Sequence, residues 1–176
     1  MDGASVPLVE VPAAVCERLA EFGASDRTNQ ALLYRALANH PEILAGWIEL
    51  AWRLRQRCAT SRRLREMMIV RGAQIAGCEY ELRNHTDLAL ANGVTAAQLE
   101  SLPEWRLSST FSNGERAALA LAEAMFAGEV HDDVLADLES HFSPEERIEL
   151  IVTAGFYAMV PRVVSALRLP LEERHR

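Results

Sequence analysis

The chain of 176 residues contains no lysine, because all 18 of its basic residues are arginine. This absence excludes, within the chain, every reaction that needs a lysine amine. A Schiff base with a carbonyl substrate, a pyridoxal-phosphate lysine and the lysine of a P-loop are all ruled out.

Cysteine is also scarce, with three residues at widely spaced positions: Cys16, Cys58 and Cys78. An odd and widely spaced set does not predict a disulfide framework. The first residues lack the basic region and the apolar region of a signal peptide. We therefore expect a cytoplasmic protein.

Positive charge is in deficit, since the net charge is −7. Nucleic-acid binding requires a basic face, so we expect no nucleic-acid partner. We also expect no membrane partner, because no apolar run looks long enough to span a bilayer.

Apolar residues recur at helical spacing along most of the chain, and no segment alternates long enough to predict a strand. We predict one all-α domain over residues 1–176, with its core motif at about residues 61–102. The expected helices cover approximately residues 13–22, 28–39, 41–54, 61–76, 78–91, 95–102, 117–126, 131–141 and a stretch from 144 onward.

Several helix boundaries are marked by their own residues. Ser112 followed by Glu115 resembles a capping box, and Thr95 is placed to cap a short helix. Residues 103–112 should form a loop. Pro161 should kink or restart the last helix, because proline lacks the backbone N–H that a helix interior needs.

A faint internal repeat joins the two halves of the chain. A shift of 83 residues aligns Glu66 with Glu149 and Gly72 with Gly155. Two related helical hairpins would explain the match, and so would chance. The shift sends Cys78 to Pro161, so the second copy would lack the chemistry of the first.

The most informative motif places a thiol, a carboxylate and an imidazole at i, i+3 and i+7: Cys78, Glu81 and His85. This spacing puts the three side chains on one helix face, and Glu66 lies on the preceding helix. Cys78 should lie in a first turn, where helix amides lower a thiol pKa. The alternative is a small buried hydrophobic residue.

The Glu81–His85 pair has two interpretations. It is either a modest contact on a helix surface or a carboxylate that orients an imidazole used as an acid or base. A divalent metal is a third use of such a face, but the spacing is no dedicated zinc signature, and we predict no metal.

Arginines are concentrated between residues 53 and 71, against the acidic net charge. Such a run usually forms salt bridges between helices. Arg71, the member closest in sequence to Cys78, is the best candidate for binding an anionic substrate, since a guanidinium pairs with carboxylates through two hydrogen bonds.

The chain resembles the carboxymuconolactone decarboxylase superfamily, which includes alkylhydroperoxidase-D-like (AhpD-like) proteins. The resemblance rests on Arg65-Glu66, Gly77-Cys78-Glu79-Tyr80-Glu81, His85 and Asn92-Gly93-Val94-Thr95. It implies an all-helical fold that assembles as homodimers, trimers or hexamers around sites between subunits.

The family resemblance implies two different sites. In the AhpD-like branch a glutamate, a Cys-x-x-Cys pair and a histidine act together, and Glu81 here stands at the second cysteine. The decarboxylase branch has Glu-x-x-x-His, which Glu81 and His85 match. It removes carbon dioxide from a carboxylated unsaturated lactone without a cofactor.

Three functional hypotheses follow. The first is an acid–base lyase of the decarboxylase type, carried by His85 and Glu81 with Cys78 and Glu66 lining the site and Arg71 binding a small, anionic substrate. The second is a peroxidase that uses Cys78 with an external reductant. The third is a non-catalytic helical oligomer that binds a ligand or protein.

Overall fold

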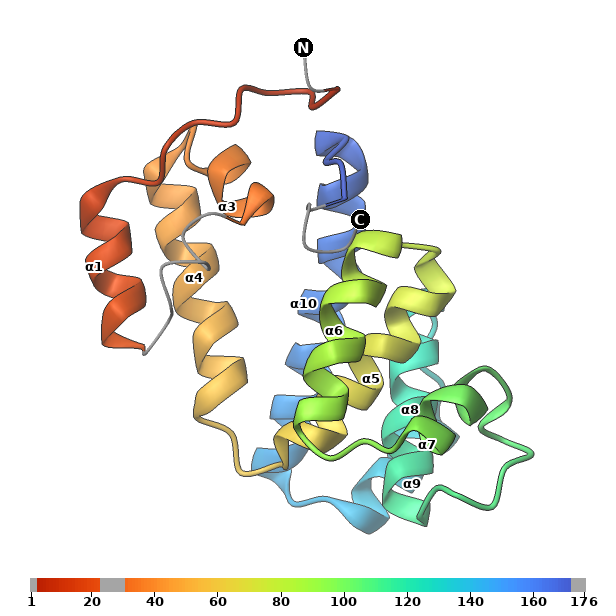
Figure 1. Ribbon diagram of the computed structural model, residues 1–176. Coiled ribbons are helices and arrows are strands. Elements are labelled where there is room, and N and C mark those ends of the chain that lie inside the picture. The colour runs from red at the N-terminus through yellow and green to blue at the C-terminus, as the bar shows by residue number, and fades with distance from the viewer. Residues whose placement is uncertain (1–2, 23–30, 172–176) are drawn as a thin grey trace. The chain divides into compact units, whose positions relative to one another are not determined.

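The computed structural model describes residues 3–22 and 31–171. All regular structure within these residues is helical, which confirms the all-α prediction (Figure 1). The chain divides into two compact units, residues 58–161 and residues 1–57 with 162–176. The single domain over the whole chain stays a prediction. The predicted helix start at residues 25–29 lies outside the described residues.

The unit that contains the N-terminal residues is built around one long helix. Its N-terminal helices are α1 (Ala13–Glu21), α3 (Leu32–Leu37) and α4 (Pro41–Gln56). Both α1 and α3 pack against α4. Proline is the first residue of α4, as predicted, because a first-turn position needs no backbone N–H.

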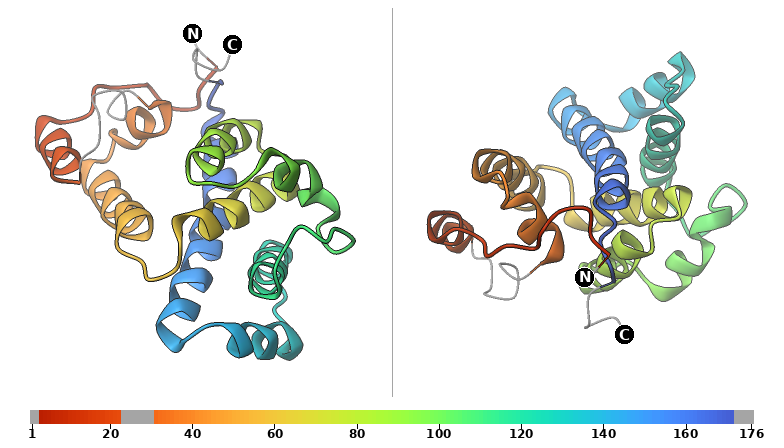
Figure 2. Two further views of the ribbon diagram at one scale, coloured as in Figure 1. Left: turned by 60° about the horizontal axis from the view of Figure 1, so that its bottom comes forward. Right: turned by 90° about the horizontal axis from the view of Figure 1, so that it is seen from above.

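The second unit carries the predicted core motif. Its helices are α5 (Arg62–Ala76), α6 (Glu79–Ala91), α7 (Ala96–Ser101), the short 3₁₀ helix η1 (Leu102–Glu104), α8 (Asn113–Ala127), α9 (Asp132–His141) and the greater part of α10 (Pro144–Leu167). Helix α5 packs against both α6 and α8, and α9 packs against α8. Figure 2 shows these helices from two further directions.

Local capping sets most of the helix boundaries in this unit. Ser112 and Glu115 form the predicted capping box, and Thr95 forms a second one with Gln98. The α5 helix ends at Gly77, whose φ of 59° lies in the left-handed region that glycine adopts without strain. The turn at Gly77 leads directly into α6, so the residues on α5 and α6 can face each other.

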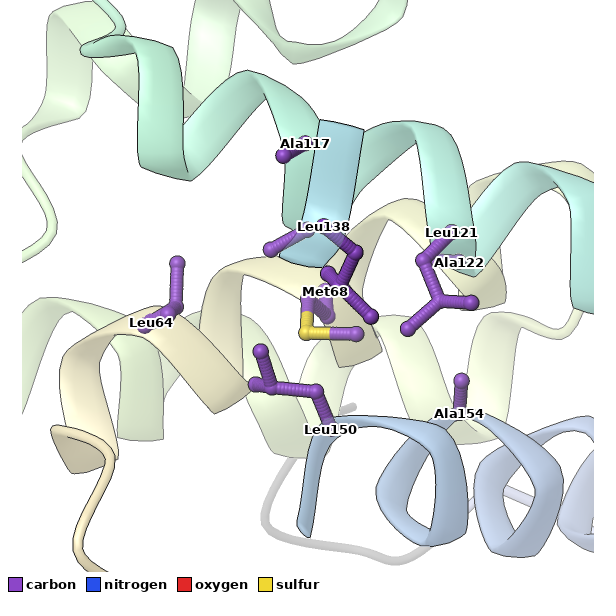
Figure 3. Packing of buried hydrophobic residues seen from close by; sticks show 9 residues of the cluster. Leu64, Met68, Ala117, Leu121, Ala122, Leu138, Leu150 and Ala154 are labelled. Atoms are coloured by element: carbon purple, nitrogen blue, oxygen red, sulfur yellow. The ribbon is translucent and has the colours of Figure 1, made fainter. Parts of the chain in front are cut away.

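Apolar side chains form a core along one side of α5 (Figure 3). Leu64 and Met68 of α5 pack with residues of three other helices: Ala117, Ala118, Leu121 and Ala122 of α8, Leu138 of α9, and Leu150 and Ala154 of α10. Because burial of apolar surface is the main stabilising contribution in folding, this cluster holds α5 in a fixed position.

One glycine allows α5 and α8 to approach closely. A methyl group at Gly72 would lie 2.3 Å from a ring carbon of Phe126, well inside van der Waals contact. Glycine at this position therefore reflects packing of the ring against the α5 backbone.

Helix α10 departs from the sequence predictions in two ways. It continues from Pro144 to Leu167 with Pro161 inside it, so the predicted restart does not occur. The shifted counterparts of Glu66, Gly72 and Cys78, which are Glu149, Gly155 and Pro161, lie in this one continuous helix, so the second copy has no turn where the first has Gly77. Buried side chains on both sides of the proline, Val160 and Val164, support the helix where a hydrogen bond is lost.

The expectation that no apolar segment is long enough for a bilayer also needs correction at α10. This helix has 24 residues, and its most apolar window has a mean hydropathy of 1.6. Half of that window is buried inside the protein, and the core helix of a soluble protein meets the same criterion of length and composition. One such helix is therefore weak evidence for a membrane span.

Candidate active site

A buried imidazole lies between two carboxylates at the centre of the site. His85 of α6 has its Nδ1 atom 2.6 Å from Oε2 of Glu66 on α5. Its Nε2 atom lies 3.4 Å from Oε2 of Glu81, one helical turn earlier on α6. The Glu66 side chain is 0% exposed and that of His85 is 4% exposed. The structure thus brings three of the five predicted site residues together.

Glu66 is also held from its other side. Arg62, one turn earlier on α5, donates a hydrogen bond from Nε to Oε1 of Glu66 over 2.5 Å and pairs with the same oxygen through its terminal nitrogen. One carboxylate oxygen therefore faces a guanidinium and the other faces the imidazole. A fully buried carboxylate needs such partners, because burial without them disfavours the charge.

Tyr157 of α10 packs edge-on against the imidazole of His85. The ring centroids are 4.9 Å apart and the planes meet at 84°. The phenol ring thus helps to shield the imidazole from water. The carboxylates of Glu66 and Glu81 face the two nitrogens of the imidazole. Neither Arg62 nor Tyr157 was selected from the sequence, although the i, i+4 spacing of Arg62 and Glu66 could have indicated the first.

The surroundings of His85 favour its charged form. Burial by itself would lower the pKa of His85, but the Tyr157 phenol group and the Glu66 and Glu81 carboxylates outweigh burial and raise the pKa to about 10. The pKa of Glu66 moves the other way. Burial would raise it, yet His85 and Arg62 together lower it. At neutral pH the imidazole is an imidazolium ion facing two carboxylates.

Cys78 caps the N-terminus of α6 instead of lying within its first turn. Burial is the largest influence and raises the pKa of the thiol, and the Glu81 carboxylate acts in the same direction. The backbone N–H groups of Glu81 and Tyr80 oppose these effects without reversing them. The expectation of a lowered pKa is therefore wrong, because burial and an adjacent carboxylate outweigh the helix amides.

Arg71 forms contacts with α8 and with its own helix. Its guanidinium donates from Nε to Oε1 of Glu123 over 2.7 Å, and another nitrogen donates to Gln74 over 3.3 Å. The same Glu123 oxygen accepts a hydrogen bond from Trp105. The partners of Arg71 in these contacts lie outside the Glu66–His85–Glu81 cluster. Its assignment as a substrate-binding residue stays a prediction.

Most of the arginine-rich stretch in this unit has a similar structural use. Arg63 pairs with Glu115, and the buried Arg65 donates a hydrogen bond to the Thr60 hydroxyl over 2.8 Å. These contacts agree with the interpretation that the run forms bridges between elements rather than an anion-binding surface.

The site offers little to a metal ion. Within residues 3–22 and 31–171 there is no group of three or more His, Cys, Asp or Glu side chains arranged to hold one. Both ring nitrogens of His85 face carboxylates, so neither is directed at an open coordination position. All three cysteines are free thiols.

Comparison with known proteins finds one similar family and an uncharacterized relative. The model of the carboxymuconolactone decarboxylase family matches residues 41–124. YnjA, an uncharacterized protein of Escherichia coli K12, is 29% identical over 133 residues, which cover 74% of this chain and 70% of YnjA.

Two solved structures share the fold over nearly the whole chain. An uncharacterized peroxidase-related protein from Silicibacter sp. TM1040 has a TM-score of 0.79 at 20% identity, covering 99% of this chain and 94% of that chain. The debrominase Bmp8, in a cysteine-to-alanine variant in complex with 2,3,4-tribromopyrrole, has a TM-score of 0.79 at 16% identity, covering 97% of this chain and 94% of that chain.

The chain is thus similar to the carboxymuconolactone decarboxylase family over residues 41–124, and it shares its helical fold with these two solved structures. The relatives differ in the activity that their names state, so the reaction has to be argued from the chemistry of the site.

Proposed function

We propose that the protein is a cofactor-independent acid–base lyase of the carboxymuconolactone decarboxylase type that acts on a small carboxylated or enolisable substrate. The observation that carries this proposal is the buried imidazole of His85, which lies between the carboxylates of Glu66 and Glu81 and whose pKa is raised to about 10. A charged imidazole with a hydrogen-bonded carboxylate on each side can store a proton and release it along a defined path.

The arrangement of the cluster supports a direction for the proton. Glu66 is fully buried and anchored by Arg62, whereas Glu81 lies next to the partly exposed Cys78 at the start of α6. His85 would therefore pass its Nε2 proton to Glu81, and Glu81 would present it to the substrate. Glu66 would hold the imidazole ring in place throughout.

In a decarboxylation the bond between the substrate carbon and its carboxylate breaks, and its electron pair enters a conjugated dienolate as carbon dioxide leaves. The dienolate carbon then takes one proton from Glu81, which His85 replaces. Solvent restores the proton on His85, so the net change is loss of carbon dioxide and uptake of one proton. No electron acceptor is needed, in keeping with a site that has a single thiol.

A Cys78-dependent peroxidase is the second candidate. The observation in its favour is that the backbone N–H groups of Tyr80 and Glu81 act on the sulfur of Cys78 and stabilise a thiolate. Burial and the Glu81 carboxylate nevertheless raise the pKa of the thiol. A thiol that stays protonated is a poor nucleophile toward peroxide, so we rank this activity second.

A direct test is to incubate the protein with a carboxylated unsaturated lactone in deuterium oxide. We expect release of carbon dioxide and a product that carries one deuterium at the dienolate carbon that takes up the proton. Reduction of an alkyl hydroperoxide by a dithiol at a higher rate, with no carbon dioxide from the lactone or from other small unsaturated carboxylates, would favour the peroxidase instead.

A further inference from the structure

Two hydroxyl groups on one face of α10 are buried without a partner. Thr153 is 1% exposed and Tyr157 is 4% exposed. They are one helical turn apart, so their side chains are neighbours on the helix surface. Within the part of the chain that the structure describes, neither hydroxyl oxygen has a hydrogen-bond partner. Buried hydroxyl groups are normally paired, so two unpaired ones side by side call for an explanation.

The Tyr157 side chain belongs to the surroundings of the proposed proton donor. Its ring packs against the edge of the His85 imidazole at 4.9 Å between centroids, and Phe156 packs against the same phenol ring at 5.3 Å. These contacts fix the position of the ring and leave the hydroxyl without a protein partner. The two imidazole nitrogens already face Glu66 and Glu81, so the cluster itself makes no use of this hydroxyl.

The proposed reaction requires a group of this kind. When carbon dioxide leaves, negative charge develops on an oxygen of the substrate, and hydrogen-bond donors near that oxygen stabilise the charge. Glu66 and Glu81 are carboxylates and would repel it. Arg71, the donor that the sequence suggested, is paired with Glu123. The hydroxyl of Tyr157, on a ring that packs against the imidazole, can donate where these groups cannot.

We propose that the hydroxyl groups of Tyr157 and Thr153 bind the anionic oxygen of the substrate, with Tyr157 as the principal donor to the oxyanion that forms during the reaction. Tyr157 thereby becomes a catalytic residue that contacts the substrate directly. The inference rests on the proposed acid–base function and names the atoms that recognise an enolate or carboxylate oxygen. Neither hydroxyl forms or breaks a covalent bond in this role.

The test uses 4-nitrophenol with the full-length protein, because its phenolate resembles a conjugated enolate and absorbs differently from the neutral phenol. We expect the wild-type protein to bind the phenolate in preference to the phenol. The variant Tyr157→Phe keeps the ring that packs on His85 and removes only the hydroxyl. Its affinity for the phenolate should fall about 10-fold or more, the usual scale for a hydrogen bond to a charged group.

Two further variants make the measurement specific. Thr153→Val keeps the shape of the side chain and should weaken phenolate binding by a smaller factor of about three to ten. Tyr34→Phe is the matched control, since Tyr34 is also buried but its hydroxyl accepts a hydrogen bond from Arg55 over 3.4 Å. This control should bind the phenolate as the wild type does.

Unchanged phenolate affinity in Tyr157→Phe would overturn the inference, as would a wild-type protein that binds only the neutral phenol or neither form. Equal losses in Tyr157→Phe and Tyr34→Phe would also count against it. The readout is binding rather than turnover, so it fails separately from the proposed function. Loss of turnover in His85→Gln with unchanged phenolate binding in Tyr157→Phe would remove the inference alone.

Discussion

Oε2 of Glu66 lies 2.6 Å from Nδ1 of His85, although the two residues are 19 positions apart in the chain. The contact joins α5 to α6 across the turn at Gly77. It converts the Glu81–His85 pair, which on its own would be an ordinary i, i+4 contact, into an imidazole held between two carboxylates. The proposed proton transfer depends on this additional carboxylate.

The first prediction concerns stability in alkaline solution. The pKa of His85 is raised from 6.5 to about 10, so the folded chain holds this proton more tightly than the unfolded chain does. The stabilisation is fully present below about pH 6.5 and is lost as the pH rises toward about 10. We expect the free energy of unfolding to fall by on the order of a few kcal/mol across this window in denaturant titrations.

The matched comparison is His85→Gln, which removes the titrating group. Its free energy of unfolding should change much less over the same pH window. The lowered pKa of Glu66 acts at the other end of the scale, where its stabilisation is lost as the pH falls below the ordinary carboxyl range. If the free energy of unfolding fell equally with pH in the wild type and in His85→Gln above neutral pH, the raised pKa of His85 would be contradicted.

The second prediction concerns the close approach of α5 and α8. Gly72→Ala should destabilise the fold by about 1–3 kcal/mol, because the new methyl group overlaps the Phe126 ring and forces it to move. Gly46→Ala is the control, since nothing lies within 4 Å of a methyl group at this helical position. It should stabilise the protein by about 0.5–1 kcal/mol. Chemical denaturation measures both changes. A Gly72→Ala variant with an unchanged free energy of unfolding would show that the Phe126 ring is not tightly packed.

The third prediction concerns redox chemistry. Cys78 has a raised pKa and Glu81 stands where a resolving cysteine would be needed, so turnover of peroxide with dithiol reductants should be slow. Peroxide should leave Cys78 as a sulfenic acid or a more oxidised species. Mass spectrometry after mild oxidation checks this directly. A disulfide from Cys78 to Cys16 or Cys58 in the same chain would show that the site has a dithiol cycle after all.

The fourth prediction concerns assembly. Ile148, Val152 and Met159 recur at helical spacing on α10 and are 63%, 36% and 41% exposed. Such a stripe favours association with a second copy of the chain. Light scattering should therefore give a mass above the 19.6 kDa of the monomer, as expected for a dimer, trimer or hexamer. A single monomeric species at micromolar concentration would contradict this expectation.

Features that depend on neighbouring residues were predictable from the sequence, whereas long-range contacts were not. The capping box that begins at Ser112 involves residues three positions apart, and the Glu81–His85 contact spans one helical turn. The partner of Arg71, in contrast, is Glu123, 52 positions later on another helix. No local pattern indicates such a pairing, so the sequence alone left Arg71 as a candidate for substrate binding.

Tertiary packing also explains why α10 does not restart at Pro161. Proline removes one backbone hydrogen bond and normally breaks or bends a helix. At Pro161 the helix nevertheless continues, with Val160 and Val164 buried on either side of the proline. Local propensity is a weak guide where buried contacts on both flanks hold the same helix. The orphan hydroxyl of Tyr157 belongs to the same class of features, because it appears only when the neighbours of α10 are known.

The acid–base function is tested most directly by the order of activity among three variants on a carboxylated unsaturated lactone. His85→Gln should keep the fold and lower turnover by about 10²-fold or more, because glutamine cannot supply a proton. Glu81→Gln should also lose activity, whereas Cys78→Ser should retain most of it. His131→Gln, at a side chain that is 73% exposed, serves as the control and should match the wild type. A folded His85→Gln variant with near wild-type turnover, or a fatal Cys78→Ser change, would contradict the acid–base account.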